Sequence, residues 1–150
     1  LPVIVKLSPN VSDIKEIALA VERAGADAIS LINTVRGMAV DVDKRTAGLP
    51  ARVRGLSGPA IKAIALYMVY QVAKVVDIPV IGCGGIVCAE DALEFIMSGA
   101  TAVQVGTANL GNPRVSLDVL EGVEHFMEEE GIKSITELIG CANVEQTADG

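Results

Sequence analysis

The sequence is poor in the residues that nucleic-acid-binding surfaces need. Acidic residues outnumber basic ones by 19 to 12, the formal net charge is −7, aromatic residues make up 3% of the chain, and tryptophan is absent. Nucleic-acid backbones attract surfaces rich in lysine and arginine, and unpaired bases stack on aromatic side chains. The composition therefore argues against a nucleic-acid partner.

Cysteine, histidine and long apolar runs are also scarce. The three cysteines, Cys83, Cys88 and Cys141, form no C-x-x-C pair and have no paired histidine, which excludes a recognisable zinc or iron–sulfur site and predicts no metal. Such usage suggests a reducing compartment, for which the cytoplasm is the default. No apolar run reaches the roughly 18 residues that a membrane span requires, and no signal peptide is visible.

Apolar residues, at 51%, are abundant enough for one globular domain with a core. They recur as a unit in which a short, β-branched apolar run precedes a helical pattern. The predicted strands are 3–7, 28–32, 79–82 and 101–105. A first helix is predicted between the N-cap signal at Ser12-Asp13 and Gly25, and others at 59–76, 89–98, 115–130 and 135–139. The segment 33–57 is predicted to be irregular, and its length indicates a lid or a site loop.

Four strand–helix units of this kind predict an α/β fold with a parallel sheet covered on both faces. Two architectures fit: a small open doubly wound sheet, or half of a (β/α)8 TIM barrel. The chain opens directly into a strand pattern, and glycines follow its last two strands, where barrels commonly bind phosphate. Both features favour the C-terminal half of a barrel, residues 1–150, whose N-terminal half is absent.

Polar residues at two strand ends are candidates for binding. Lys6 interrupts an apolar strand, where an ammonium group needs a counter-charge or an electron-rich ligand unless it simply reaches solvent. Asn33 and Thr34 follow the second strand and offer an amide and a hydroxyl to a planar, hydrogen-bonding substrate. The alternative for Asn33 is that it only caps the turn.

Glycine-rich turns follow the third and fourth strands. Gly82-Cys-Gly84-Gly85 does not match G-x-G-x-x-G, because the apolar Ile86-Val87 follow and no glycine stands at the third position, so a nicotinamide-binding site is disfavoured. Together with Gly106-Thr107, the turn offers two adjacent sets of unobstructed backbone N–H groups. Such a pair suits a single phosphate, as in a mononucleotide cofactor.

The chain resembles the dihydroorotate dehydrogenase family, and within it the class 1, NAD-linked (1B) catalytic subunit. The likeness extends from residue 1 to about residue 140. It rests on Val3–Asn10, Ser30–Thr34, Gly37–Asp41, Gly55–Lys62, Ile64–Leu66, Ile81–Gly82, Gly84–Ile86 and Val103–Asn109.

This resemblance implies an FMN-binding TIM barrel, a flavoprotein oxidoreductase that converts dihydroorotate to orotate in pyrimidine (UMP) biosynthesis in the cytoplasm. It also implies a homodimer of catalytic subunits and an electron-transfer subunit, which carries FAD and an iron–sulfur cluster and passes electrons to NAD.

Carried over residue by residue, the resemblance implies that Lys6 contacts the flavin ring and Ile32 flanks it, while Asn33 and Thr34 bind the pyrimidine substrate. A positive charge beside the ring stabilises negative charge that develops there. Backbone groups would hold the FMN phosphate and its surroundings, and we expect Gly84→Val or Gly106→Val to abolish binding. These groups belong to Gly58, Gly84, Gly85, Gly106 and Thr107.

The resemblance places the catalytic base, a cysteine, on a loop of the first half of the barrel, so no catalytic residue is expected in this chain. Cys83 lies in the glycine turn but does not match that base, and all three cysteines are interpreted as unreactive thiols. The chain departs from the family at Arg54, where a glycine is usual, and at Ala63, where a proline is usual.

Two alternatives accompany this interpretation. One is a related FMN barrel such as a dihydropyrimidine dehydrogenase, which shares the lysine, the Ile-Asn-Thr segment and the glycine turns. The other is a catalytically silent half barrel that folds alone or pairs with itself to bury its open edges. The fragment by itself is expected to form no orotate.

Overall fold

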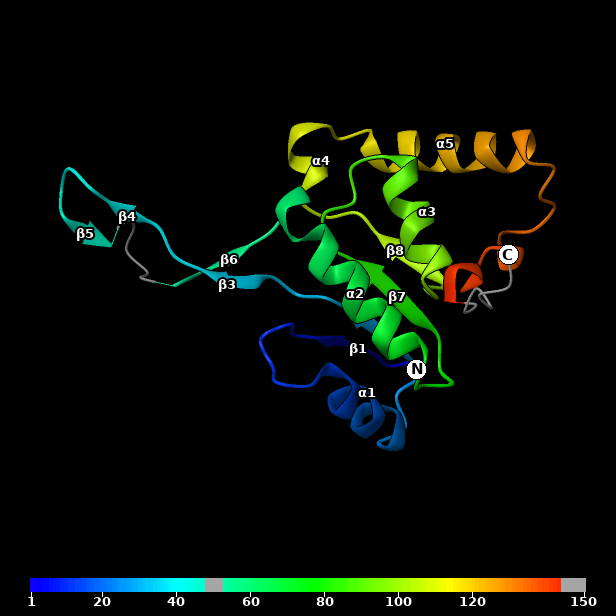
Figure 1. Cartoon of the computed structure of the whole chain (residues 1–150), viewed down its shortest axis with the longest axis horizontal. Coiled ribbons are helices and arrows are strands. Elements are labelled where there is room, and N and C mark those ends of the chain that lie inside the picture. Colours follow the sequence, from blue (N-terminus) through cyan, green and yellow to red (C-terminus); the bar gives the residue numbers. More distant parts are fainter. Residues whose placement is uncertain (48–52, 144–150) are drawn as a thin grey trace, which may run out of the picture.

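The computed structural model describes residues 1–47 and 53–143, and its centre is a four-stranded parallel sheet (Figure 1). The strand order is β1-β2-β7-β8, so β1 and β8 form the two edges. Each predicted strand is present and differs from its predicted bounds by at most one residue at either end. The strands are β1 (Ile4–Leu7), β2 (Ala28–Leu31), β7 (Val80–Cys83) and β8 (Ala102–Gln104).

The helices also follow the predicted pattern. The Asp13 side chain accepts a hydrogen bond of 2.8 Å from the N–H of Lys15 and caps the first helix, and Gly25 ends it with a φ of 90°. No helix within the described residues is long and apolar enough to cross a membrane. The principal helices are α1 (Ile14–Arg23), α2 (Lys62–Ala73), α3 (Ala89–Met97) and α5 (Val115–Glu129).

Shorter helical turns adjoin these helices. A 3-10 turn, η1 (Pro59–Ile61), leads into α2, and a short helix that was not predicted, α4 (Ala108–Gly111), follows β8. The helix predicted at 135–139 is a 3-10 turn, η2 (Ile135–Glu137). Ser134 and Glu137 form a capping box at its start. A further 3-10 turn, η3, covers Cys141–Asn143.

The helices cover one face of the sheet. Helix α1 packs on β1 and β2, α2 on β2 and β7, and α3 on β8, and each of these helices packs against the next. The prediction that both faces are covered is therefore wrong for the described residues. On the other face the side chains of Lys6 and Gln104 are exposed. A one-sided helical layer is the arrangement of a barrel wall and not of a doubly wound sheet.

The core lies between the sheet and this helical layer. Its fully buried side chains include Phe95 of α3, Ile29 and Leu31 of β2, and Val69 of α2. Phe95 packs directly on β7, because a Cβ added to Gly82 would lie 2.6 Å from the Phe95 ring. Gly82 therefore allows close packing of α3 on the sheet, and the glycines that shape the turn come after it.

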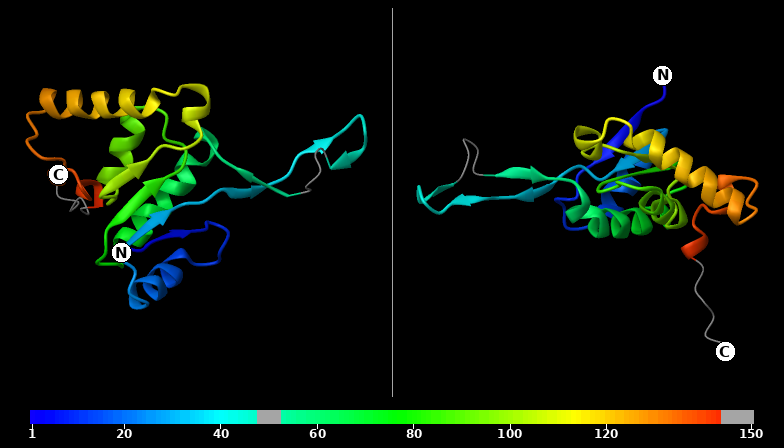
Figure 2. Two further views of the ribbon diagram at one scale, coloured as in Figure 1. Left: turned by 180° about the vertical axis from the view of Figure 1, so that it is seen from behind. Right: turned by 90° about the horizontal axis from the view of Figure 1, so that it is seen from above.

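The segment between β2 and α2 forms an arm of short antiparallel strands that extends away from the body (Figure 2). Strand β3 (Val35–Gly37) pairs with β6 (Arg54–Leu56), and β4 (Val40–Asp41) pairs with β5 (Thr46–Ala47). The prediction of an irregular segment over 33–57 is thus wrong for 33–47 and 53–57, and its remainder, 48–52, lies outside the described residues. Arg54 is exposed on β6, so its replacement of the usual glycine meets no steric obstacle.

Candidate functional site

A cavity lies at the carboxyl ends of the sheet strands, the end at which parallel α/β folds bind ligands. The structure brings every residue predicted for the cofactor or the substrate to the wall of this one cavity. Co-location does not by itself assign a role to any of them. The predicted residues that line the cavity are Lys6, Ile32, Asn33, Thr34, Gly58, Gly84, Gly85, Gly106 and Thr107.

Lys6 reaches the cavity from β1. Its ammonium group donates hydrogen bonds of 3.4 Å to Cys83 Sγ and to Gln104 Oε1, and Ser30 Oγ donates a bond of 2.8 Å to the same Gln104 oxygen. Among the residues that the structure describes, no carboxylate forms an ion pair with Lys6. The cavity therefore contains a positive charge without a protein counter-charge, which favours an electron-rich or anionic ligand.

Asn33 and Thr34 follow Ile32, which is 2% exposed, just after the end of β2, and all three residues line the cavity. Asn33 Oδ1 accepts a hydrogen bond of 2.8 Å from the N–H of Thr34, and the Thr34 carbonyl accepts one of 3.0 Å from Asn10 Nδ2. Asn33 thus stabilises the turn and lines the cavity at once, so the two interpretations of this residue are compatible. Its amide NH2 group has no acceptor within the described part of the chain.

The glycine turns pack against each other. Gly58, Gly84 and Gly85 have φ values of 87°, 137° and 80°, which side-chain-bearing residues rarely adopt. A Cβ on Gly85 would lie 3.0 Å from the Gly58 carbonyl oxygen and 2.8 Å from the Cβ of Lys62. The turn after β7 is therefore seated directly on the turn that begins α2.

Backbone donors around the cavity lack internal partners. The N–H groups of Gly84, Gly85, Gly106 and Thr107 donate no hydrogen bond to any described residue. Gly106 has no atom within 4 Å of its hypothetical Cβ, so nothing in the described protein occupies the space beside it. Half-buried N–H groups such as those of Gly84 and Gly85 normally find acceptors, and their lack of one is consistent with a ligand that brings its own oxygen atoms. Gly106 and Thr107 are exposed, so their N–H groups are open to a ligand or to water.

Side chains beyond the nine predicted ones also form hydrogen bonds at this site. Ser57 Oγ accepts a hydrogen bond of 2.8 Å from the Thr107 hydroxyl and so links the turn before α2 to the turn after β8. Cys83 and Gln104 contact Lys6, and Cys83 also lines the cavity. Gln104 could have been found, because it is a polar residue in an apolar strand, as Lys6 is.

The cysteines and acidic residues form no metal centre in the described residues, where no group of three or more histidine, cysteine, aspartate or glutamate side chains is suited to hold a metal ion. All three cysteines are free thiols. Cys88 is the residue before α3, and burial, assisted by its interaction with Glu90, raises the pKa of its thiol. A protonated thiol is a poor nucleophile, so Cys88 has no evident chemistry.

Comparison with known proteins identifies relatives across nearly the whole chain. The dihydroorotate dehydrogenase family profile matches residues 1–127. The catalytic subunits of dihydroorotate dehydrogenase B (NAD(+)) from Lachnoclostridium phytofermentans and Desulforamulus reducens are 59% and 58% identical over 93% and 96% of this chain. The corresponding subunit from Caldicellulosiruptor bescii is 54% identical over 95%.

The matches also define how much of each relative is represented. The chain spans about half the length of the curated relatives, 47% of the first two and 48% of the third. Among solved structures, a crystal structure of DHODH from Eimeria tenella in complex with ferulenol matches with a TM-score of 0.77 and 26% identity. That match covers 95% of this chain and 38% of the other. The predicted α/β fold, part of a TIM barrel, is confirmed.

Proposed function

Because the chain belongs to the dihydroorotate dehydrogenase family, we propose that it forms the C-terminal half of an FMN-binding barrel whose complete polypeptide oxidises dihydroorotate to orotate. One observation carries this proposal: nine residues chosen from the sequence for a flavin and its substrate line a single cavity. Relatives at 54–59% identity that carry this enzyme's name support the choice of reaction.

The residues of the cavity fit FMN. The N–H groups of Gly84, Gly85, Gly106 and Thr107 have no acceptor among residues 1–47 and 53–143, and Gly106 faces open space there, as a phosphate cradle requires. Together with Gly58, these backbone groups would hold the phosphate. Ile32, buried and at the cavity wall, would flank the ring.

The polar side chains have distinct proposed roles. When bound, FMN accepts a hydride equivalent from the substrate, and the second hydrogen leaves as a proton to a base. Lys6 would lie beside the ring, where its charge stabilises negative charge that develops during the reaction. Asn33 has an unused amide NH2 group and Thr34 a hydroxyl, and both would orient the pyrimidine.

The proton acceptor is proposed to lie outside this chain, on the preceding half of the barrel. Cys83 is the thiol that lines the cavity, but its contact is with the Lys6 ammonium, which donates to the sulfur at 3.4 Å. An ammonium group has no lone pair with which to accept the thiol proton, and the family resemblance places the base on the other half of the barrel. We therefore propose that Cys83 packs beside the ligand without exchanging a proton with it.

The partners follow from the names of the relatives. Each is called the catalytic subunit of an NAD(+)-linked enzyme, which implies a separate subunit for electron transfer. We propose that this subunit carries FAD and an iron–sulfur cluster, that the catalytic subunit is a homodimer, and that the assembly works in the cytoplasm. The electrons would pass from FMN through the partner subunit to NAD.

The test uses the complete polypeptide, meaning this chain joined to the preceding half of its barrel, purified with the electron-transfer subunit and FMN. We expect NADH to form with dihydroorotate and not with dihydrouracil. Cys83→Ala is expected to keep turnover within about threefold of the wild type, whereas a loss of about 100-fold would identify Cys83 as a participant in proton transfer. Turnover of dihydrouracil alone would replace the proposed function with that of a dihydropyrimidine dehydrogenase.

A further inference from the structure

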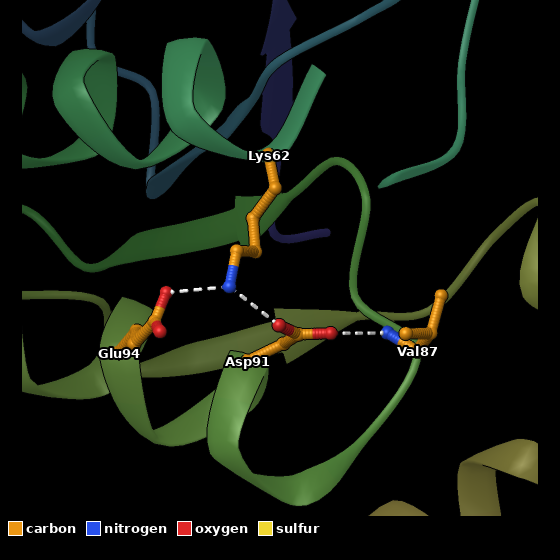
Figure 3. A network of polar contacts seen from close by, with 4 residues as sticks. All are labelled: Lys62, Val87, Asp91 and Glu94. Carbon is orange, nitrogen blue, oxygen red and sulfur yellow. Dashed lines mark hydrogen bonds and ion pairs between the residues drawn. The ribbon is translucent and has the colours of Figure 1, made fainter. Parts of the chain in front are cut away.

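A charged network joins α2, α3 and the turn after β7 (Figure 3). Lys62, the first residue of α2, reaches across to α3, and its Nζ contacts Asp91 Oδ1 at 2.6 Å and Glu94 Oε2 at 2.9 Å. The second oxygen of Asp91 accepts a hydrogen bond of 2.8 Å from the N–H of Val87. One carboxylate thus connects the start of α2, the first turn of α3 and the end of the turn after β7.

The network is partly shielded from water. The side chain of Asp91 is 10% exposed and that of Lys62 is 29% exposed. Burial raises the pKa of Asp91, but hydrogen bonds from Lys62 and from the Val87 N–H lower it more, so the net shift is downward. The two carboxylates raise the pKa of Lys62. Both members of the Lys62–Asp91 pair therefore stay charged at neutral pH.

The same residues enclose the turn after β7 from both sides. The backbone and Cβ of Lys62 lie against Gly85, and Gly85 lies against the Gly58 carbonyl. Asp91 accepts a hydrogen bond from the Val87 N–H at the far end of the turn. The N–H groups of Gly84 and Gly85 remain without acceptors and border the cavity.

We propose that Lys62 and Asp91 are positioning residues that hold the turns at Gly58 and at Gly84–Val87 in one arrangement and thereby set the affinity for the phosphate group of a mononucleotide. This inference rests on the proposed function. The pair does not touch the ligand. It acts through the backbone, by fixing where the N–H groups of Gly84 and Gly85 point.

The role is geometric and not one of charge attraction. Lys62 faces two carboxylates, so the network as a whole carries one net negative charge and cannot draw an anion to the cavity. Asp91 is buried, so loss of Lys62 leaves its charge less compensated and also lowers the stability of the fold. A positioning role is therefore identified by an effect on phosphate binding that exceeds any general loss of stability.

A comparison of FMN with riboflavin tests this role, because riboflavin has the same ring and ribityl chain and lacks the phosphate. In the complete polypeptide, freed of flavin, the dissociation constants of both are measured by fluorescence quenching. We expect Lys62→Met and Asp91→Asn to raise the dissociation constant of FMN about tenfold and to leave that of riboflavin within about twofold of the wild type. The reason is that displaced N–H donors lose only their contacts with the phosphate.

Two variants serve as controls. Glu94→Gln removes one ion pair of Lys62 but leaves the Asp91–Val87 bond, and we expect FMN affinity within about twofold of the wild type. Lys62→Arg keeps the charge and should restore most of the FMN affinity that Lys62→Met loses. If Asp91→Asn does not fold, Asp91→Glu replaces it, since the longer carboxylate shifts Val87 and should still weaken FMN selectively.

The outcomes separate this inference from the function on which it rests. Equal loss of FMN and riboflavin, or unchanged FMN affinity in Lys62→Met or in the Asp91 variant, overturns the positioning role while dihydroorotate turnover by the wild type stands. A wild type that binds neither flavin overturns the proposed function, and the positioning role falls with it. Selective loss of FMN supports both.

Discussion

The glycines that line the cavity are glycines for different reasons. Gly84 has a φ of 137°, and a Cβ there would lie 2.9 Å from the Cβ of Ala65, so this residue is required by its backbone conformation and by core packing. Gly106 has no such constraint, because no described atom lies within 4 Å of its hypothetical Cβ. The family resemblance predicts one role for both residues, to hold the FMN phosphate and its surroundings. The structure distinguishes them.

Valine substitutions should separate these two roles. Gly84→Val should lower the free energy of unfolding by about 2–4 kcal/mol, because it combines a strained φ with overpacking against α2. Gly106→Val should leave the free energy of unfolding within about 0.5 kcal/mol of the wild type. It should weaken FMN binding by about tenfold or more, because the side chain fills the cradle. Urea unfolding and FMN titration of the complete polypeptide measure both effects. A Gly106→Val protein that binds FMN as the wild type does would exclude Gly106 from the cradle.

The sequence reveals site residues that interrupt apolar strands better than it reveals residues whose partners are distant along the chain. Lys6, Asn33 and the glycine turns are visible because each interrupts an apolar run. Ser57 is not visible, since its partner Thr107 lies 50 residues away and only the fold brings their hydroxyls to 2.8 Å. The Lys62–Asp91 pair is hidden for the same reason: both residues read as ordinary charged positions in the first turn of a helix.

At the scale of elements, the strands and helices of the sheet follow from apolar periodicity, and the arm does not. Its strands are two or three residues long, too short to show a period of two. Their pairing partners are also distant in the sequence, as Val35 and Leu56 are. Such pairing depends on where β2 and α2 hold the two ends of the arm, which local sequence does not encode.

The base of the arm depends on close contact between Gly55 and Thr34. A Cβ on Gly55 would lie 2.6 Å from the Cβ of Thr34, whereas one on Gly37, in the neighbouring strand, would have an ordinary contact of 3.5 Å with Leu56. We expect Gly55→Ala to displace Thr34 and to raise the KM for dihydroorotate about tenfold, with FMN affinity unchanged. Steady-state kinetics and FMN titration of the complete polypeptide measure this.

The matched control in the same arm is Gly37→Ala. It should leave the KM within about twofold, because the new methyl group makes only an ordinary van der Waals contact with Leu56. If Gly55→Ala and Gly37→Ala raise the KM equally, general loosening of the arm accounts for the effect, and Thr34 loses its proposed contact with the substrate. If neither variant changes the KM, the base of the arm does not contribute to substrate binding.

At the scale of the whole molecule, the sheet has two open sides. β1 and β8 each pair with one neighbour only within the described residues, and Ile4 of β1 is 54% exposed. An apolar groove runs beside β8, between α3 and α5, and is lined by Ile96, Val103 and Met127 among others. In a closed barrel, further strands and helices would cover these surfaces.

This architecture predicts that the chain 1–150 alone, supplied with FMN, dihydroorotate and an electron-accepting dye that reoxidises reduced FMN, forms no orotate. Only one side of the cavity is present, the proposed base lies elsewhere, and two unpaired strand edges promote association. Orotate absorbance measures turnover, and analytical ultracentrifugation measures association. Adding the separately expressed preceding half should restore orotate formation, because it supplies both the missing wall and the base. Steady turnover by the purified chain alone would contradict this division of the site between two halves.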